Sequence, residues 1–119
     1  MKNNLQKKII KLHDGLENDF LSKGRGISCP LCNGIINVTL YNAKLLHSFD
    51  SVEINKFMKG LGNIKINSKH GELYYKKGVV MCKREICSNK EHDFHIIFNY
   101  EETQPSRYLS YLLGVFLID

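Results

Sequence analysis

Four cysteines are the residues of this sequence with the clearest chemistry, and they occur as two close pairs. Cys29 and Cys32 enclose a Pro-Leu dipeptide, whereas Cys82 and Cys87 enclose four residues, and 49 residues separate the two pairs. Zn²⁺ prefers four soft or borderline ligands at the corners of a tetrahedron, and two short loops that each present two sulfurs supply that geometry. The spacing therefore predicts one structural zinc ion, with ligands Cys29, Cys32, Cys82 and Cys87.

The expected compartment favours a metal over a disulfide. The first eight residues contain neither an apolar core nor a cleavage site, so we expect no secretory signal, and no apolar run reaches the length of a membrane-spanning helix. We therefore expect a cytoplasmic, intracellular protein in a reducing environment, where structural disulfides are rare. A disulfide or redox role and unlinked thiols in a core stay open as alternatives for the cysteines.

Two histidines that follow the second pair are further candidate ligands. His92 lies in a polar turn five residues after Cys87 and is the alternative fourth ligand if one cysteine does not bind the metal. His95 lies within residues 93–100, which we expect to form a strand. On that strand His95 points away from Phe94, so we expect a half-exposed strand histidine, although it too could replace a cysteine.

The first cysteine pair has the local sequence of a zinc knuckle. Pro30 stiffens the turn, and the dipeptide Asn33-Gly34 tolerates positive φ, which lets backbone N–H groups turn toward the thiolates. Together with Val79-Val80-Met81-Cys82 leading to Cys87, these residues resemble the zinc-ribbon superfamily over residues 27–100. The resemblance implies two knuckles on β-hairpins with a metal between them. Zinc ribbons serve transcription, translation, nucleic-acid processing and protein docking, so the resemblance implies an architecture rather than one activity.

The helices and strands expected around the cysteines indicate an α+β, zinc-ribbon-like fold in a single domain of residues 1–119. Apolar residues at spacings of three and four predict an N-terminal amphipathic helix over residues 1–22. Pro105 and Ser106 precede an apolar run, which predicts a C-terminal apolar helix over residues 105–118.

Between these two helices, the ribbon core of residues 27–100 contains an insertion. Asp50 with Glu53 forms a capping-box pattern, and Gly62 is a natural stop, so we expect a short inserted helix between them. Alternating and β-branched residues predict strands over residues 35–41, 63–67, 72–81 and 93–100.

The charge is unevenly distributed along the chain. Residues 1–90 carry 16 Lys and Arg against seven Asp and Glu, whereas residues 91–119 carry one against five, and the formal net charge is +5. A local basic region can bind a phosphate backbone even when the whole chain is mildly cationic. The predicted nucleic-acid-binding surface is the hairpin with the second cysteine pair, and it comprises Lys65, Lys69, Tyr74, Lys76, Lys77, Lys83 and Arg84.

A structural metal and a basic surface favour a binding module over an enzyme. In zinc deaminases a His-x-Glu motif precedes a Pro-Cys-x-x-Cys motif. Here no His-x-Glu precedes the first cysteine pair, the proline lies inside that pair, and a Gly-rich phosphate loop is absent, so we expect no enzymatic activity. The expected partner is nucleic acid or a nucleic-acid-processing protein complex, and the expected role is that of an accessory or regulatory factor in transcription. One alternative is a protein-docking inhibitor or modulator of an enzyme, such as a viral or mobile-element factor acting on host transcription or defence. A metal-dependent nuclease with His92 or His95 as its base is the third hypothesis.

Overall fold

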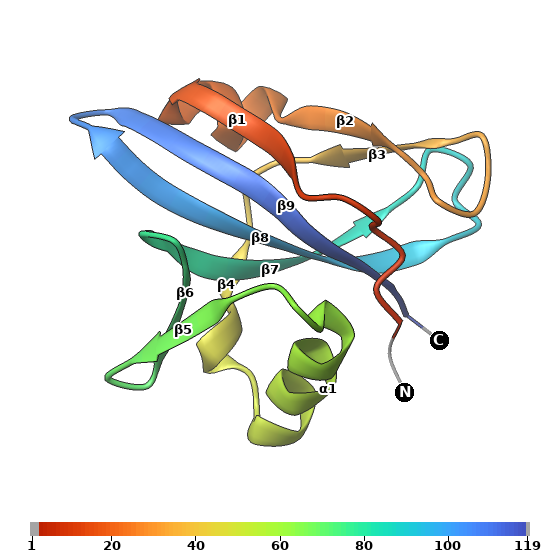
Figure 1. Cartoon of the computed structure of the whole chain (residues 1–119). Coiled ribbons are helices and arrows are strands. Elements are labelled where there is room, and N and C mark those ends of the chain that lie inside the picture. The colour runs from red at the N-terminus through yellow and green to blue at the C-terminus, as the bar shows by residue number, and fades with distance from the viewer. Residues whose placement is uncertain (1–2, 119) are drawn as a thin grey trace.

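The computed structural model describes residues 3–118, and over this range the chain consists mostly of β-strands (Figure 1). In chain order the elements are β1 (Ile10–Leu16), the short π-helix η1 (Asp19–Lys23), β2 (Arg25–Ser28), β3 (Ile35–Val38), β4 (Lys44–Leu45), the 3-10 helix η2 (Leu46–Ser48), α1 (Ser51–Leu61), β5 (Ile66–Lys69), β6 (Glu72–Tyr75), β7 (Gly78–Ile86), β8 (Asp93–Gln104) and β9 (Arg107–Leu117).

One antiparallel sheet organises these elements. Its strand order is β1-β9-β8-β7-β6-β5, and the short β4 also pairs with β7. β8 and β7 lie at the centre, the long β9 lies between β8 and β1, and β1 and β5 are the two edge strands. β2 and β3 form a separate two-stranded sheet. The candidate ligands lie in the loop of this small hairpin and in the loop that joins β7 to β8.

Both faces of the central strands are covered, which makes three layers. In Figure 1 the β2–β3 hairpin lies on one side of the sheet and α1 on the other. On the hairpin side, Phe94, Ile96 and Phe98 of β8 belong to a core that includes Ile36 of β3. On the opposite side, Ile97 belongs to a second core with residues of α1. The apolar run of β8 is therefore continuous because neighbouring side chains are buried in opposite cores.

The predicted inserted helix is confirmed as α1. The Asp50 carboxylate accepts a hydrogen bond of 2.9 Å from the backbone N–H of Glu53, which is the N-terminal half of the predicted capping box. Gly62 ends the helix with a φ of 59°, a conformation that favours glycine. Phe57 and Leu61 are buried against the sheet and give the helix its place beneath β7, β8 and β9.

The two predicted terminal helices are wrong, and so is the α+β, zinc-ribbon-like fold class built on them. The segment expected to be an N-terminal amphipathic helix contains β1 and η1, and the segment expected to be a C-terminal apolar helix is β9. The fold is mostly β, with one large antiparallel sheet. No helix within residues 3–118 has the length and apolar character needed to cross a membrane.

The predicted internal strands correspond to observed strands with shifted limits. The strand expected over residues 35–41 is β3, and the strand expected over 93–100 is the first part of β8. The strand expected over 72–81 is interrupted, because Lys76 has a φ of 54° and turns the chain from β6 into β7. This turn changes the surface on which the predicted basic residues lie.

A buried polar side chain fixes the middle of the sheet. Asn99 of β8 is completely buried, and its Nδ2 donates a 2.9 Å hydrogen bond to the carbonyl of Tyr75. The backbone N–H of Tyr111 donates a 2.7 Å bond to Asn99 Oδ1. The side chain thereby satisfies one backbone group on β6 and another on β9, close to the β-bulge in the pairing of β8 with β9.

Candidate metal centre

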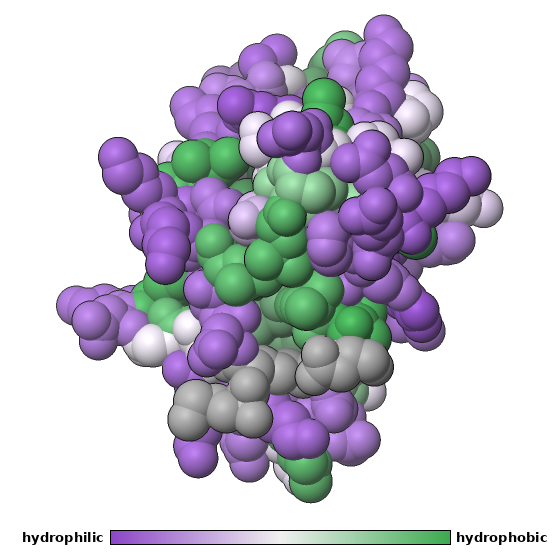
Figure 2. Space-filling view, turned by 90° about the vertical axis from the view of Figure 1, so that its right-hand side faces the viewer, coloured by the Kyte–Doolittle hydropathy of each residue, from purple (hydrophilic) through white to green (hydrophobic). Residues whose placement is uncertain are grey.

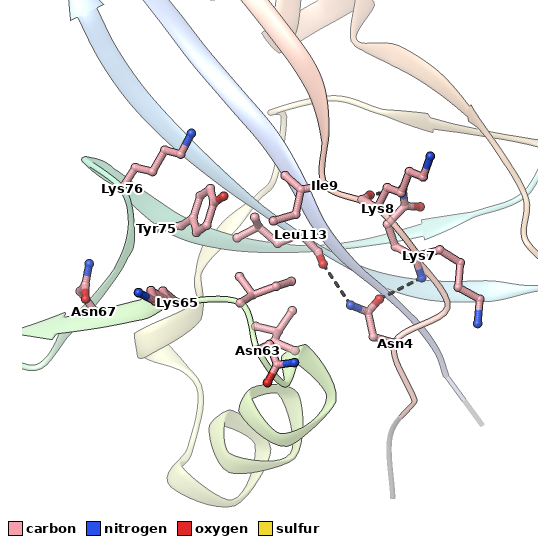
Figure 3. A pocket seen from close by; sticks show the side chains of 13 residues that line it. Asn4, Lys7, Lys8, Ile9, Asn63, Lys65, Asn67, Tyr75, Lys76 and Leu113 are labelled. Atoms are coloured by element: carbon pink, nitrogen blue, oxygen red, sulfur yellow. Dashed lines mark hydrogen bonds between the residues drawn. The ribbon is translucent and has the colours of Figure 1, made fainter.

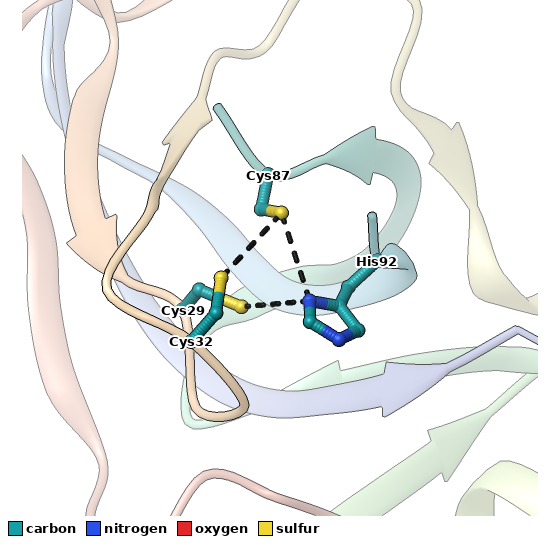
Figure 4. A group of neighbouring side chains, drawn as sticks. All are labelled: Cys29, Cys32, Cys87 and His92. Atoms are coloured by element: carbon teal, nitrogen blue, oxygen red, sulfur yellow. Dashed lines mark hydrogen bonds between the residues drawn. The ribbon is translucent and has the colours of Figure 1, made fainter. Parts of the chain in front are cut away.

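Three cysteines and a histidine from two loops meet at one end of the sheet. Cys29 and Cys32 lie in the loop between β2 and β3, and Cys87 and His92 lie in the loop between β7 and β8. Figure 4 shows the four side chains directed toward a common centre. Two cysteines from one hairpin thus face a cysteine and a histidine from another, although the two loops are more than 50 residues apart in the sequence.

The distances among the donor atoms are compatible with one small metal ion. All four ligand atoms lie within 4.8 Å of one another. The Sγ atoms of Cys32 and Cys87 are 3.8 Å apart, and Nδ1 of His92 lies 3.8 Å from Sγ of Cys29 and 3.8 Å from Sγ of Cys87. Three of the six donor separations are thus 3.8 Å and none exceeds 4.8 Å, which is compatible with the tetrahedral arrangement of structural metal sites with cysteine and histidine ligands.

The first loop is shaped by its own backbone hydrogen bonds. The N–H of Cys29 donates to the carbonyl of Gly34 at 2.9 Å, which closes the loop, and the N–H of Gly34 donates to Sγ of Cys32 at 3.3 Å. A backbone donor after Cys32 therefore points at a thiolate, as the sequence suggests, but neither Asn33 nor Gly34 has the positive φ expected of that turn. A Cβ at position 34 would lie 3.0 Å from Oγ of Ser88 and 3.3 Å from Sγ of Cys32, so glycine also leaves room for the second loop.

The second loop is held in the same way and is fastened to the first. The N–H of Cys87 donates to the carbonyl of His92 at 3.0 Å, which brings these two ligands together. Ser88 then joins the loops, because its N–H donates to the carbonyl of Ile35 and its Oγ accepts from the N–H of Ile35, both at 2.8–2.9 Å. Asn89 Nδ2 donates to Sγ of Cys32 at 3.4 Å. Ser88 and Asn89 were not among the predicted site residues, and their position directly after Cys87 is the one sequence signal for them.

The electrostatic environment favours thiolates over thiols at two of the cysteines. For Cys87, burial raises the pKa, but hydrogen bonds from the backbone of His92 and Glu91 and from the His92 ring outweigh it and lower the pKa to about 6. The N–H of Gly34 is the largest influence on Cys32 and lowers its pKa. Burial raises the pKa of Cys29. Hydrogen bonds to the Cys87 and Cys32 sulfurs raise the pKa of His92. A metal needs deprotonated sulfur, and the loops supply the donors that stabilise it.

The structure places Cys82 outside this group. Cys82 lies within β7, paired with Ile97 and Lys44, and its side chain is 1% exposed in the core shared with α1. Cys87 follows the end of β7, five residues further along. Because a strand rises about 3.3 Å per residue, those five residues separate the two cysteines by about 16 Å. The alternative fourth ligand, His92, occupies the position in the cluster that the spacing had assigned to Cys82.

His95 also lies away from the cluster. It is on β8, opposite Arg84, and its ring packs edge-on against Phe57 at 5.3 Å and Phe49 at 6.4 Å between centroids. The ring belongs to the α1 side of the sheet, whereas the cluster joins the β2–β3 side. His95 is partly exposed, as expected for a strand histidine, but its surroundings are aromatic rather than polar.

The predicted nucleic-acid-binding residues fall into two groups. Lys83 Nζ lies 2.9 Å from the Glu85 carboxylate and also donates to Thr39, and the side chain is only 10% exposed. Arg84 donates to the Asp93 carboxylate with two of its nitrogens. These two cations are therefore neutralised within the fold. The remaining predicted residues, Lys65, Lys69, Tyr74, Lys76 and Lys77, lie on or beside the β5–β6 hairpin, and none of these lysines forms an ion pair with a residue of the described range 3–118.

Comparison with known proteins does not extend this description. No family model, curated protein or solved structure matches the chain.

Proposed function

We propose that the cluster holds one Zn²⁺ ion in a structural role. Three thiolates and an imidazole are a common donor set for zinc. A tetrahedron with Zn–S bonds of about 2.3 Å has sulfur–sulfur edges of about 3.8 Å, and the Sγ atoms of Cys32 and Cys87 are 3.8 Å apart. All four donors come from the protein, so the site lacks the open position that a catalytic zinc keeps for water or substrate.

The proposed ion joins two layers of the fold. The β2–β3 sheet has two strands, and an isolated two-stranded hairpin is marginally stable in water. Its apolar side chains Ile36 and Val38 are fully buried against the central sheet, and the cluster fastens its loop to the loop between β7 and β8. The chemistry that zinc supplies here is cross-linking, and no reaction step is assigned to it.

We further propose that the zinc-stabilised fold is a nucleic-acid-binding module. The observation that carries this proposal is a hollow of about 470 Å³ on the β5–β6 hairpin, which we call the hairpin hollow. Lysines and a tyrosine of the predicted surface line it, namely Lys69, Tyr74, Lys76 and Lys77. Unpaired lysines attract phosphates, and a tyrosine ring offers a stacking surface for a base. Its one carboxylate, on Glu72, contacts the hydroxyl of Tyr74 rather than a lysine.

Binding of a short fluorescent single-stranded oligonucleotide, followed by anisotropy over a range of salt concentrations, tests this proposal. We expect the affinity to fall steeply with salt, with a slope set by the number of phosphate contacts. The double variant Lys69→Glu/Lys77→Glu is expected to bind at least about tenfold more weakly. The double variant Lys44→Glu/Lys59→Glu has the same net charge, and both of its substitutions lie outside the hollow. Equal loss in both variants would show a nonspecific effect of net charge and contradict the assigned surface.

Protein docking is the second candidate function, and one observation favours it. Leu31, Ile35 and Ile86 are 44%, 56% and 51% exposed beside the metal cluster. Figure 2 views the side of the molecule on which these loops lie in Figure 1 and shows apolar surface bordered by hydrophilic side chains. A partner that docks there would be released by Ile35→Ser or Ile86→Ser and would be indifferent to reversal of the hairpin lysines. The predicted C-terminal helix has no part in this candidate, since that segment is the buried strand β9.

A further inference from the structure

A second, larger hollow lies beside the β5–β6 hairpin, and we call it the lysine groove. It has a volume of about 790 Å³ and is formed by residues 4–9, by the connection from α1 to β5, by the β6–β7 turn and by β9. Figure 3 shows these segments around the opening, with Lys76 and Tyr75 on one side and Lys7 and Lys8 on the other. The volume falls within the range of small-molecule sites and is large enough for one or two nucleotides.

The wall formed by residues 4–9 is fixed to the sheet. Asn4 Nδ2 donates to the carbonyl of Leu113 at 3.0 Å, and Asn4 Oδ1 accepts from the N–H of Val115 at 3.0 Å. The N–H of Leu5 donates to the carbonyl of Val115 at 2.8 Å. This segment therefore continues along β9 as an ordered wall, which gives the groove a defined shape before any ligand binds.

Only one sign of charge is present in the groove. Lysines on three of its segments line it, namely Lys7, Lys8, Lys65 and Lys76, and no Asp or Glu among residues 3–118 does. None of the four has a carboxylate partner within the described part of the chain. Cations gathered in a concave surface without counter-charges attract an anion with several charges. The hairpin hollow, by contrast, contains the carboxylate of Glu72.

The interior of the groove suits an aromatic ligand as well as an anion. Its floor is apolar and includes Leu61, Ile64 and Leu113. The ring of Tyr75 lies at one wall, and Lys76 Nζ lies 5.7 Å from the centre of that ring. Side-chain amides complete the lining, with Asn63 and Asn67 able to donate and accept hydrogen bonds. Aromatic and apolar surface, amides and cations together match the base and the phosphate of a nucleotide.

We propose that the lysine groove binds a short single-stranded segment of nucleic acid, with bases against Tyr75 and the apolar floor and phosphates at the surrounding lysines. The inference rests on the proposed nucleic-acid function and gives it a location and a substrate class. Lys76 and Asn67 line both the groove and the hairpin hollow, so one strand can pass from one to the other. Lys7 and Lys8 are thereby binding residues in addition to the lysines of the hairpin.

Three double variants with the same change in net charge test the location. Lys7→Glu/Lys8→Glu alters the groove, Lys69→Glu/Lys77→Glu alters the hairpin hollow, and Lys44→Glu/Lys59→Glu alters neither. Each is titrated against short fluorescent poly-dT and poly-rU, and its melting temperature is measured to verify folding. We expect the groove variant to bind at least about tenfold more weakly, with a salt slope shallower by about 1.4, because two phosphate contacts are lost. The control variant should bind as the unaltered protein does, within about twofold.

Three further measurements test which class of ligand binds in the groove and whether the variants weaken binding directly. A thymidine dinucleotide should shift the backbone amide signals of residues 4–9, 61–67 and 75–76 in the unaltered, metal-loaded protein. Tyr75→Leu retains an apolar side chain and should weaken oligonucleotide binding about fivefold or more, because a stacked base loses its ring. Poly-glutamate of matching charge should compete poorly with the oligonucleotide, since it has no base.

The outcomes distinguish failure of the groove proposal from failure of the proposed nucleic-acid binding. If the protein binds oligonucleotides and only the hairpin variant is weakened, the groove is overturned and nucleic-acid binding stands. If the unaltered protein shows no salt-dependent binding of either oligonucleotide, both proposals are overturned. If poly-glutamate competes as well as the oligonucleotide, the groove is a site for acidic peptides and the nucleic-acid assignment of the groove is overturned.

Discussion

Replacement of one cluster cysteine, compared with replacement of Cys82, is the perturbation that separates the observed site from the one suggested by sequence spacing. We expect Cys29→Ser to abolish stoichiometric zinc binding, since Cys29 Sγ lies 3.8 Å from Nδ1 of His92 in the cluster. We expect Cys82→Ala to leave zinc binding intact, because Cys82 lies in the core beneath β7. Sequence spacing alone predicts loss of zinc in both variants.

The size of the stability change follows from the separation of the two ligand pairs. Zinc stabilises the fold because the folded chain already holds the two ligand pairs together. An unfolded chain that bound zinc with all four donors would first have to close a loop of at least 55 residues. Closing a loop of that length costs about 4 kcal/mol at 25 °C. A chain of 119 residues has a total stability of roughly 6 to 18 kcal/mol at the usual value per residue. Loss of zinc should therefore lower the melting temperature by about 15 °C.

Replacement of Cys82 should cost less stability than replacement of Cys29 and should leave the zinc content unchanged. Cys82→Ala removes one sulfur from a site that is 1% exposed, at a cost of about 1 to 2 kcal/mol, or about 5 °C. Elemental analysis gives the zinc content of each variant, and thermal denaturation with and without a chelator gives the metal-dependent part of its stability. The chelator should destabilise Cys82→Ala and leave Cys29→Ser unchanged. A Cys29→Ser protein that retains stoichiometric zinc, or a Cys82→Ala protein that loses it, would refute the assignment.

Three further predictions concern the rest of the fold. Asn99→Leu should cost about 3 kcal/mol in a denaturant titration, because two buried backbone groups lose their partner; a loss below about 1 kcal/mol would contradict that role. Tyr100 and Tyr108 should ionise above the ordinary pKa of 10.0, since burial chiefly raises the first pKa and the hydrogen bond to Glu102 chiefly raises the second. The fold favours the neutral phenols, so this stabilisation is complete below pH 10.0 and is lost as the pH rises above it; tyrosinate absorbance and melting temperature against pH measure both effects, and a Tyr100→Phe protein should lose less stability at alkaline pH. Asp50→Ala should lower the free energy of unfolding by about 1 kcal/mol through loss of the helix cap, and an unchanged value would show that the cap is not stabilising.

The sequence identifies most of the metal cluster because local turns determine it. Cys29 and Cys32 are close in sequence and flank the turn at Pro30-Leu31, so short-range chemistry predicts them. The choice between Cys82 and His92 depends on where β7 ends, which is a property of pairing with β8. Because β7 is extended from Cys82 to its end before Cys87, the two sulfurs lie too far apart to bind the same ion. That extension, more than the spacing of cysteines, decides the fourth ligand.

The terminal helices were mispredicted because strand patterns can imitate a helical period. In β9, Leu113 is the extra residue of a β-bulge, since Ile97 pairs with Gly114 and Phe98 with Leu112. The bulge reverses the alternation, so Leu112 and Val115 belong to one core although they are three residues apart. Residues three apart on one face are the signature of a helix. A spacing of four, as between Leu12 and Leu16 of β1, fits both a strand and a helix and cannot decide between them.

The basic surface was predictable in composition but not in arrangement. The sequence shows that the region is rich in lysine. It does not show that Glu85 forms an ion pair with Lys83 on β7, or that Asp93 of β8 forms one with Arg84. Lys7 and Lys8 approach the β6–β7 turn only because residues 4–9 run along β9. Such long-range neighbours follow from sheet topology, which composition does not encode.

X-ray absorption spectroscopy at the zinc edge is the most direct test of the metal centre. The proposal predicts one zinc per chain with three sulfur ligands at about 2.3 Å and one nitrogen ligand at about 2.0 to 2.1 Å, from Cys29, Cys32, Cys87 and His92. A first shell of four sulfurs would require Cys82 in place of His92, and a spectrum with oxygen ligands, or a purified protein that binds no zinc, would contradict a closed structural site.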